Sequence, residues 1–224
     1  HLIKACIDSG GKILEFIKDA SIESDEINLI IKDNPNVKIH IMQHDLFTKI
    51  SDLISVTGLM ALINIPTSHS MEPHGLRLLL DKIQDPGNLG GIIRTAAAVG
   101  VNSVFLSEGC NDAWSPKTLR GSQGAHFSLS CYEHQNLENL IGLFDCPVYS
   151  LSMKGESLYK IDLPKNVAII LGSEGQGVSQ KLLEKSTKTI CIPMTQGVES
   201  LNVGSAASII MYEYYRQSQL HLRA

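Results

Sequence analysis

Three segments in the second half of the chain combine glycines with side chains that could bind and orient a ligand. The first, "NLGGIIRTAAAVG", reads as a helix and carries paired glycines four and three residues before Arg94. Each glycine costs a helix about 1 kcal/mol relative to alanine, and at these spacings both leave the helix surface beneath Arg94 bare. We therefore expect another group to lie close to this backbone. The simpler alternative is a solvent-exposed arginine on a helix whose N-cap is Asn88.

The second segment, "VAIILGSEGQGVSQKLLEK", reads as a strand, a glycine loop and a helix that begins near Ser179. Glycines let a ligand approach backbone amides, and a helix N-terminus favours an anion. The spacing is G-x-x-G-x-G rather than the G-x-G-x-x-G of dinucleotide-binding proteins. The acid that those proteins carry about 20 residues further on is also missing, because Ile192, expected within a strand, stands there. Glu174 in the loop is either a site residue or an exposed turn carboxylate.

The third segment, "ICIPMTQGVESLNVGSAASIIMYEYYR", begins like a strand and ends like a helix. Eleven residues, Pro193 to Val203, separate the two elements, and ordered loops of that length are more often functional than incidental. Asn202 is placed to cap the final helix. Alanine, serine and glycine fill its first turns, so we expect another backbone to pack unusually close to them.

These segments are positioned by alternating strand and helix patterns. Beyond residue 75, strands are expected at "LRLLLDKI", "SVFLSE", "PVYSLS", "VAIILG" and "TICIPM", with helices between them. Strands that are apolar on both faces and spaced by helices predict an α/β fold with a mainly parallel sheet covered on both sides. Ligands bind such sheets at the carboxyl ends of their strands, where all three segments fall.

A second, smaller α/β unit is expected before this sheet. Short strand and helix patterns alternate from Lys12 to Ile65, and the polar, proline-containing segment "PTSHSMEPHG" reads as a linker. We therefore expect two domains, residues 1–70 and 71–224. The chain opens in what reads as a helix already under way, so we expect the N-terminal domain to be incomplete.

Composition excludes several classes of protein. The 224 residues are 43% hydrophobic and 19% charged with a formal net charge of −4, so any nucleic-acid contact must use a local basic patch. No apolar run approaches the roughly 20 residues of a membrane span. The five cysteines are odd in number and contain no CxxC pair, which argues against a disulfide framework or a zinc knuckle and favours a cytoplasmic protein.

His40 and His44, four residues apart, are the candidates for metal ligands. The segment "KIHIMQH" reads as a strand that runs into a turn, and no carboxylate or cysteine cluster joins the pair in the sequence. We therefore expect no metal site.

Together, "NLGGIIRTAAAVG", "LGSEGQGVS" and "IPMTQGVESLNVGSAASIIMYE" resemble the three ordered motifs of the SpoU/TrmH family of RNA ribose 2′-O-methyltransferases. The resemblance covers residues 76–217. It implies a methyltransferase that uses S-adenosylmethionine, releases S-adenosylhomocysteine and forms a homodimer through its knotted domain. It also implies a C-terminal trefoil knot, a rare exception to the usual chain topology, which the long third loop would help to form. The first 65 residues look like the small ribosomal-protein-like domain that many members use to grip RNA.

The resemblance also assigns roles to single residues. Those expected to hold the cofactor are Gly172, Ile192, Met194, Ser200 and Leu201. Those expected to form the catalytic site are Arg94, Asn88, Glu174, Ser200 and Asn202. RNA contacts are expected from Arg94, Lys117 and Arg120, with Lys154 as a further candidate for a phosphate contact.

Two questions stay open at this level. A guanidinium stays protonated and is normally only a donor. Arg94 is therefore either the group that activates the hydroxyl or, as we favour, a cation that holds a phosphate or the developing alkoxide. The function also has alternatives, which are an RNA-binding knot protein without activity and a nucleotide-cofactor oxidoreductase. The sequence does not identify the target, which is ribosomal or transfer RNA.

Overall fold

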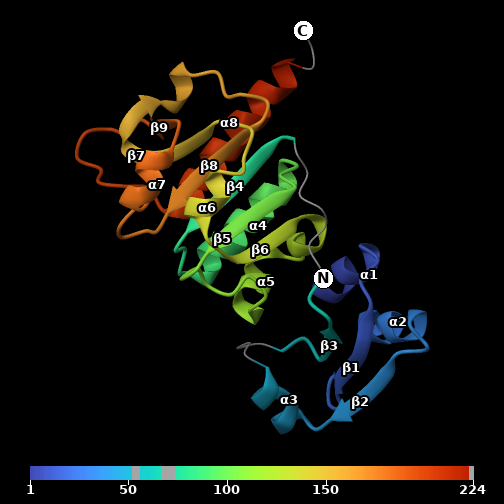
Figure 1. Ribbon diagram of the computed structural model, residues 1–224. Helices are drawn as coiled ribbons and strands as arrows, with labels where there is room; N and C mark the ends of the chain where they lie inside the picture. Colours follow the sequence, from blue (N-terminus) through green and yellow to red (C-terminus); the bar gives the residue numbers. More distant parts are fainter. Residues whose placement is uncertain (52–55, 67–73, 222–224) are drawn as a thin grey trace. The chain divides into compact units, whose positions relative to one another are not determined.

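The structure is a computed structural model that describes residues 1–51, 56–66 and 74–221. The chain divides into two compact units, His1–Thr67 and Ser68–Ala224 (Figure 1). The linker that the sequence suggested at residues 66–75 lies mostly outside the described residues.

The N-terminal unit is a three-stranded sheet with short helices. Its elements are α1 (Leu2–Asp8), β1 (Ile13–Asp19), α2 (Asp25–Asp33), β2 (Lys38–Met42), α3 (His44–Ile50) and β3 (Leu59–Ile63). The strand order is β2-β1-β3, with β2 parallel and β3 antiparallel to β1. Its core contains Phe16 from β1, Ile27 from α2 and Phe47 from α3, all buried.

The C-terminal unit contains a sheet of six parallel strands in the order β6-β5-β4-β8-β7-β9. Its strands are β4 (Leu76–Asp81), β5 (Ser103–Ser107), β6 (Ser130–Gln135), β7 (Val148–Ser157), β8 (Val167–Gly172) and β9 (Lys188–Cys191). Its helices are α4 (Pro86–Ala98), α5 (Pro116–Ser122), α6 (Leu137–Ile141), α7 (Gln180–Lys185) and α8 (Val203–His221), with short 3₁₀ turns η1 (Ala125–Ser128) and η2 (Leu158–Lys160).

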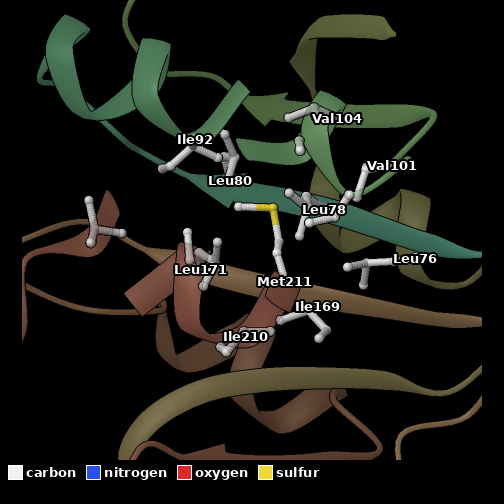
Figure 2. Close-up of a cluster of buried hydrophobic side chains, with 14 of the residues drawn as sticks. Leu76, Leu78, Leu80, Ile92, Val101, Val104, Ile169, Leu171, Ile210 and Met211 are labelled. Carbon is white, nitrogen blue, oxygen red and sulfur yellow. The ribbon is translucent and has the colours of Figure 1, made fainter. Parts of the chain in front are cut away.

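Hydrophobic side chains cover both faces of this sheet, which confirms the α/β fold class. Leu78 and Leu80 of β4 point to one face, where α4 and α8 pack and Met211 lies among the strand side chains (Figure 2). Leu79 points to the opposite face, in a second core that α6 and α7 complete. The alternation along β4 therefore places apolar side chains in both cores.

Three details of the elements differ from expectation. Strand β6 was not predicted, because its polar sequence "SCYEHQ" at the sheet edge lacks a strand pattern. Strand β9 ends at Cys191, so Ile192 lies just beyond it. The N-cap of α4 is Asp85 rather than Asn88, because a carboxylate followed by Pro86 caps a helix and Asp85 accepts the backbone N–H of Asn88 at 2.7 Å.

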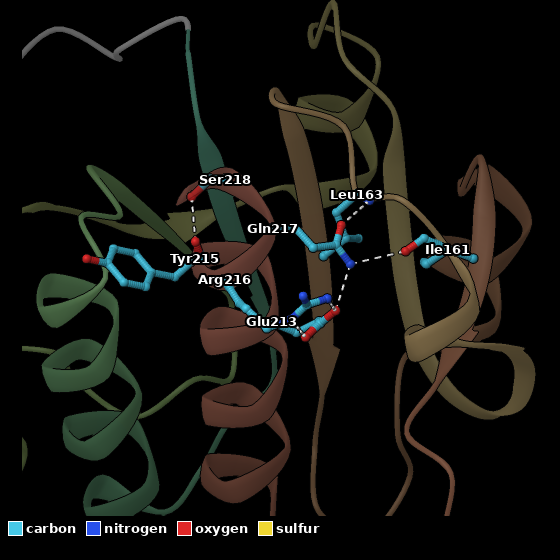
Figure 3. A network of polar contacts seen from close by, with 7 residues as sticks. All are labelled: Ile161, Leu163, Glu213, Tyr215, Arg216, Gln217 and Ser218. Carbon is cyan, nitrogen blue, oxygen red and sulfur yellow. Dashed lines mark hydrogen bonds and ion pairs between the residues drawn. The ribbon is translucent and has the colours of Figure 1, made fainter. Parts of the chain in front are cut away.

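Helix α8 is fixed to the chain that precedes β8 by a buried polar network (Figure 3). Gln217 accepts the N–H of Leu163 at 2.7 Å and donates to the carbonyl of Ile161 at 3.1 Å. Gln217 also donates to Glu213, and paired hydrogen bonds from Arg216 hold the pKa of Glu213 below its usual value. The network fixes the register of the C-terminal helix against the sheet.

Candidate functional site

A cavity of about 510 Å³ opens where β7, β8 and β9 end. Six of the residues that the sequence singled out line it, namely Gly172, Glu174, Ile192, Met194, Ser200 and Leu201. They come from two loops that are distant in the sequence, so the fold brings the second and third segments together. Backbone groups of the glycine loop and apolar side chains beyond β9 supply most of the lining.

The glycine loop folds back tightly on itself. A β-carbon at Gly172 would lie 2.0 Å from the carbonyl carbon of Gly177, so no larger residue fits there without moving backbone. The N–H of Gly177 donates to the carbonyl of Ser173 at 2.9 Å. Ser179 occupies the N-cap of α7 as predicted, but its side chain makes no capping bond, and its N–H donates to the buried carboxylate of Asp81 at 2.9 Å. Asp81 thereby ties the loop to the end of β4.

A chain of hydrogen bonds joins the three segments. Asn202 Nδ2 donates to Asn88 Oδ1 at 2.9 Å, and Asn88 Nδ2 donates to Glu174 Oε1 at 2.6 Å. Asn202 Oδ1 in turn accepts the N–H of Ser205 at 3.2 Å, so Asn202 caps α8 as predicted. We call Asn202, Asn88 and Glu174 the amide relay. Its direction is fixed, because each amide nitrogen donates and the carboxylate of Glu174 can only accept.

Arg94 does not line the same cavity. It lies on the rim of a second, open hollow of about 370 Å³ between α4 and α8, with Gly91, Thr95, Gly204 and Ser208. Asn88 and Asn202 also line this hollow, so the amide relay forms the connection between the two concavities. Arg94 is exposed and therefore free to contact a macromolecule.

The expectation that another group lies close to the backbone beneath Arg94 holds at Gly90 and fails at Gly91. At Gly90 a β-carbon would lie 2.6 Å from the carbonyl oxygen of Thr118, so the close neighbour is α5 of the same chain. At Gly91 no atom lies within 4 Å, and the surface is open. The nearest group to a β-carbon at Gly204 would be Asn202 Oδ1, at 3.2 Å, so at this glycine the neighbour is a side chain rather than the backbone that we expected.

Lys117 and Arg120 lie on α5 and are both exposed. They line neither concavity. Gly121, which follows Arg120, is part of the hollow beside Arg94, so the two side chains come from a helix that borders it.

Several residues around the site were missed by the sequence reasoning. These are Asp81, Asp85 and Glu199. The first two carry signals that could have been used, an acid at the end of a buried strand and an acid directly before proline. Glu199 has no local signal, because only the fold brings it to the cavity. Lys154, which the sequence offered as a further phosphate contact, lines this cavity instead.

Each of the two candidate metal-ligand histidines has a single carboxylate partner in the part of the chain that the structure describes. His40 Nε2 lies 2.8 Å from Glu15 Oε2, and His44 Nδ1 lies 2.6 Å from Asp19 Oδ2. Burial opposes ionisation of Asp19, but hydrogen bonds from Ser21 and His44 outweigh it and hold its pKa below the usual value. Among the described residues, no three His, Cys, Asp or Glu side chains come together to hold a metal.

None of the helices in the described ranges has the length and apolar character that crossing a membrane requires.

Comparison with known proteins gives one consistent family. The SpoU rRNA Methylase family model matches residues 75–212. The chain is 36% identical over 188 residues to the uncharacterised tRNA/rRNA methyltransferase slr1673 of Synechocystis, covering 81% of this chain and 69% of that protein. It is 31% identical over 216 residues to the 23S rRNA (guanosine(2553)-2′-O)-methyltransferase RlmP of Bacillus subtilis, covering 95% and 84%.

The fold is also that of a solved SpoU enzyme. The structure of the methyltransferase AviRb from Streptomyces viridochromogenes, in complex with AdoMet, superposes with a TM-score of 0.88 at 22% identity and covers 97% of this chain and 87% of that one. The match of the family model to more than half of the chain carries the assignment. The chain belongs to the SpoU rRNA methylase family and is an RNA methyltransferase whose cofactor is S-adenosylmethionine.

Proposed function

We propose that this enzyme methylates a ribose 2′-hydroxyl of ribosomal or transfer RNA. The observation that carries the proposal is the amide relay, which joins the cofactor cavity to the hollow that Arg94 borders. A methyl transfer needs donor and acceptor sites that are adjacent and fixed relative to one another. The 2′-O specificity in the name of the Bacillus subtilis relative supports the same reaction here.

The cavity residues fit S-adenosylmethionine. Its volume of about 510 Å³ is in the usual range for small-molecule sites. Ile192 and Leu201 offer apolar surface for an adenine ring, while the loop from Gly172 to Gly177 offers backbone groups at close range. Met194 and Ser200 complete the same wall. When bound, the cofactor supplies an electrophilic methyl group on a sulfonium.

Arg94 acts as a cation in this proposal rather than as a base. Its guanidinium holds an RNA phosphate or stabilises the developing alkoxide, and solvent or an RNA phosphate receives the hydroxyl proton. Glu174, Asn88 and Asn202 keep the cavity wall in place beside the acceptor, and Ser200 lies on the same wall.

RNA binding extends from Arg94 to Lys117 and Arg120 on the neighbouring α5. The N-terminal unit, with its small mixed sheet, contributes target choice in the manner that the ribosomal-protein-like resemblance implies. The reaction takes place in the cytoplasm.

We also propose that the enzyme is a homodimer through the faces of α4 and α8, and that the C-terminal segment is threaded as a trefoil knot. The hollow between these helices is lined by small residues, and Tyr212 and Tyr215 continue along α8 as exposed apolar side chains. In this arrangement the hollow forms part of the subunit interface, the RNA ribose is held there beside the amide relay, and Arg94 of the partner subunit completes the site. A fully active monomer in sedimentation velocity would exclude it.

The function is tested in two steps. Calorimetry should detect binding of S-adenosylhomocysteine and no binding of NAD, which separates a methyltransferase from an oxidoreductase. Transfer of a labelled methyl group to RNA from a deletion strain, followed by alkaline hydrolysis, then locates the product, because a 2′-O-methyl group protects the adjacent phosphodiester. Cofactor binding without transfer to any RNA fraction would favour the RNA-binding protein without activity, and label on a base would refute ribose methylation.

A further inference from the structure

Strand β7 contains a bulge at the edge of the cofactor cavity. Leu151 and Glu156 are both paired with Ile190 of β9, so the residues from Ser152 to Gly155 are extruded from the ladder. Bulges of this kind often redirect side chains next to active sites.

Contacts with β9 hold the residues at the end of this bulge in place. A β-carbon at Gly155 would lie 2.7 Å from the carbonyl oxygen of Thr189, so the bulge rests directly on β9. Cys191 Sγ donates to the carbonyl of Gly155 at 3.2 Å. Lys188 Nζ forms an ion pair with Glu156 at 2.9 Å, and this hydrogen bond raises the pKa of Lys188. The tip of the bulge is therefore presented from a fixed position.

Lys154 lies within this bulge and lines the cofactor cavity. Among the described residues of the lining it is the only lysine or arginine, whereas two carboxylates, Glu174 and Glu199, share the same wall. Across the described part of the chain, Lys154 has no carboxylate within ion-pair distance. Its ammonium group is exposed and available to a ligand.

We propose that Lys154 binds the α-carboxylate of the methionyl part of S-adenosylmethionine and so determines recognition of that part of the cofactor. The inference rests on the proposed function. The cofactor carries two cationic groups, a sulfonium and an ammonium, and one carboxylate. The cavity offers the complementary set, two carboxylates and one lysine, and such matching favours one orientation of a ligand. An RNA phosphate fits less well, because Glu174 and Glu199 would repel it.

The test measures binding by calorimetry and needs no knowledge of the RNA target. The probes are S-adenosylhomocysteine, which has the carboxylate, and 5′-deoxy-5′-methylthioadenosine, which lacks the amino-acid part. Lys154→Met should raise the Kd of S-adenosylhomocysteine about fivefold and change the Kd of 5′-deoxy-5′-methylthioadenosine by less than a factor of two. Lys154→Arg keeps the positive charge and should therefore keep most of the affinity for S-adenosylhomocysteine. Lys160→Met is the matched control, because Lys160 is exposed and does not line the cavity.

Each other outcome overturns the inference. Equal weakening of both probes means that Lys154 only shapes the cavity. Unchanged binding of S-adenosylhomocysteine in Lys154→Met means that Lys154 does not contact the carboxylate. If the unaltered protein binds neither probe, the proposed function itself fails. This outcome differs from a failure of the Lys154 inference alone, in which the unaltered protein still binds S-adenosylhomocysteine.

Discussion

At the scale of single residues, Asn88 is the centre of the amide relay. Its backbone N–H is held by Asp85, its carbonyl oxygen Oδ1 accepts from Asn202, and its amide nitrogen donates to Glu174. A side chain with both polar ends engaged cannot rotate without breaking a hydrogen bond, so its orientation fixes the position of the carboxylate. We predict that the hydrogen bond between residues 88 and 174 can be reversed in direction by exchanging which side chain donates and which accepts.

Asn88→Asp should lower kcat/KM about 100-fold, because it replaces a charge-assisted hydrogen bond by two facing carboxylates, a change of about 2–3 kcal/mol. Steady-state kinetics with the methylated RNA fraction measures the loss. Adding Glu174→Gln should recover part of it, because the new amide can donate to Asp at position 88. Losses that simply add in the double variant would contradict the relay.

For Arg94, we predict that Arg94→Lys retains measurable turnover with a raised KM for RNA. Lysine keeps the positive charge but loses the fork geometry of the guanidinium. Kinetics and RNA-binding measurements on the same preparation separate the two effects. Complete loss of turnover with normal RNA binding would show that the guanidinium takes part in proton transfer.

His126 predicts a pH-dependent stability. It is buried beside Trp114, with ring centroids 5.0 Å apart, and burial lowers its pKa to about 4. The unfolded chain takes up this proton near pH 6.5 and the folded chain only near pH 4, so stability should fall by up to about 3 kcal/mol as the pH drops through that interval. Urea unfolding followed by Trp114, the single tryptophan, measures it. His126→Gln should lack this component, and an identical pH profile in the two proteins would refute the assignment.

At the scale of elements, the contact between α4 and α5 depends on backbone approach. Gly90 and Gly121 face one another across it, and a β-carbon at Gly90 would lie 2.8 Å from Gly121 Cα. Two adjacent glycines of α4 therefore have opposite roles. One permits helix packing, and the other, Gly91, borders the open hollow.

Gly90→Ala should destabilise the protein by about 2 kcal/mol, because the added methyl group meets backbone atoms that cannot move independently. Gly91→Ala, in which the new methyl group meets no atom within 4 Å, should stabilise the helix by up to about 1 kcal/mol. Urea midpoints of the two variants and the unaltered protein give the comparison. A neutral Gly90→Ala would show that α5 does not pack as closely as described.

At the scale of the whole molecule, the charge distribution limits how RNA is bound. The formal net charge is −4, and residues 1–67 contain six lysines, no arginine and nine acidic residues. The N-terminal unit therefore offers little general attraction for phosphate. In the proposed RNA path the phosphates are held by Arg94, Lys117 and Arg120 near the hollow, and Lys154 binds the cofactor rather than RNA.

If Arg94, Lys117 and Arg120 each neutralise one phosphate, the logarithm of RNA affinity should fall with the logarithm of salt concentration at a slope of about −2, at roughly 0.7 per contact on single strands. Filter binding across a range of KCl concentrations measures the slope. Replacing Lys117 and Arg120 together by glutamine should reduce it to about −0.7. An unchanged slope in that variant would place the RNA path elsewhere.

The sequence by itself determined the fold class and the segments that form the site. Runs such as "LRLLLD" and "VAIILG" are apolar on both faces, and this property belongs to the local pattern. The glycine loop and Asn202 also carried local signals, because tight turns and helix caps demand particular residue types. The cofactor residues predicted from the resemblance all line one cavity.

Only the tertiary structure decided how these parts meet. Contacts between segments far apart in the chain decide three features, which are the separation of Arg94 from the cofactor cavity, the amide relay and the position of Lys154. A choice between two nearby candidates decides that Asp85 caps α4. Asn88 and Glu174 are 86 positions apart, so no pattern of hydrophobic residues in the sequence could predict the hydrogen bond between them. The physical reason is that sequence patterns report what a segment buries, whereas the geometry of a site is set by which strand ends the sheet order places side by side.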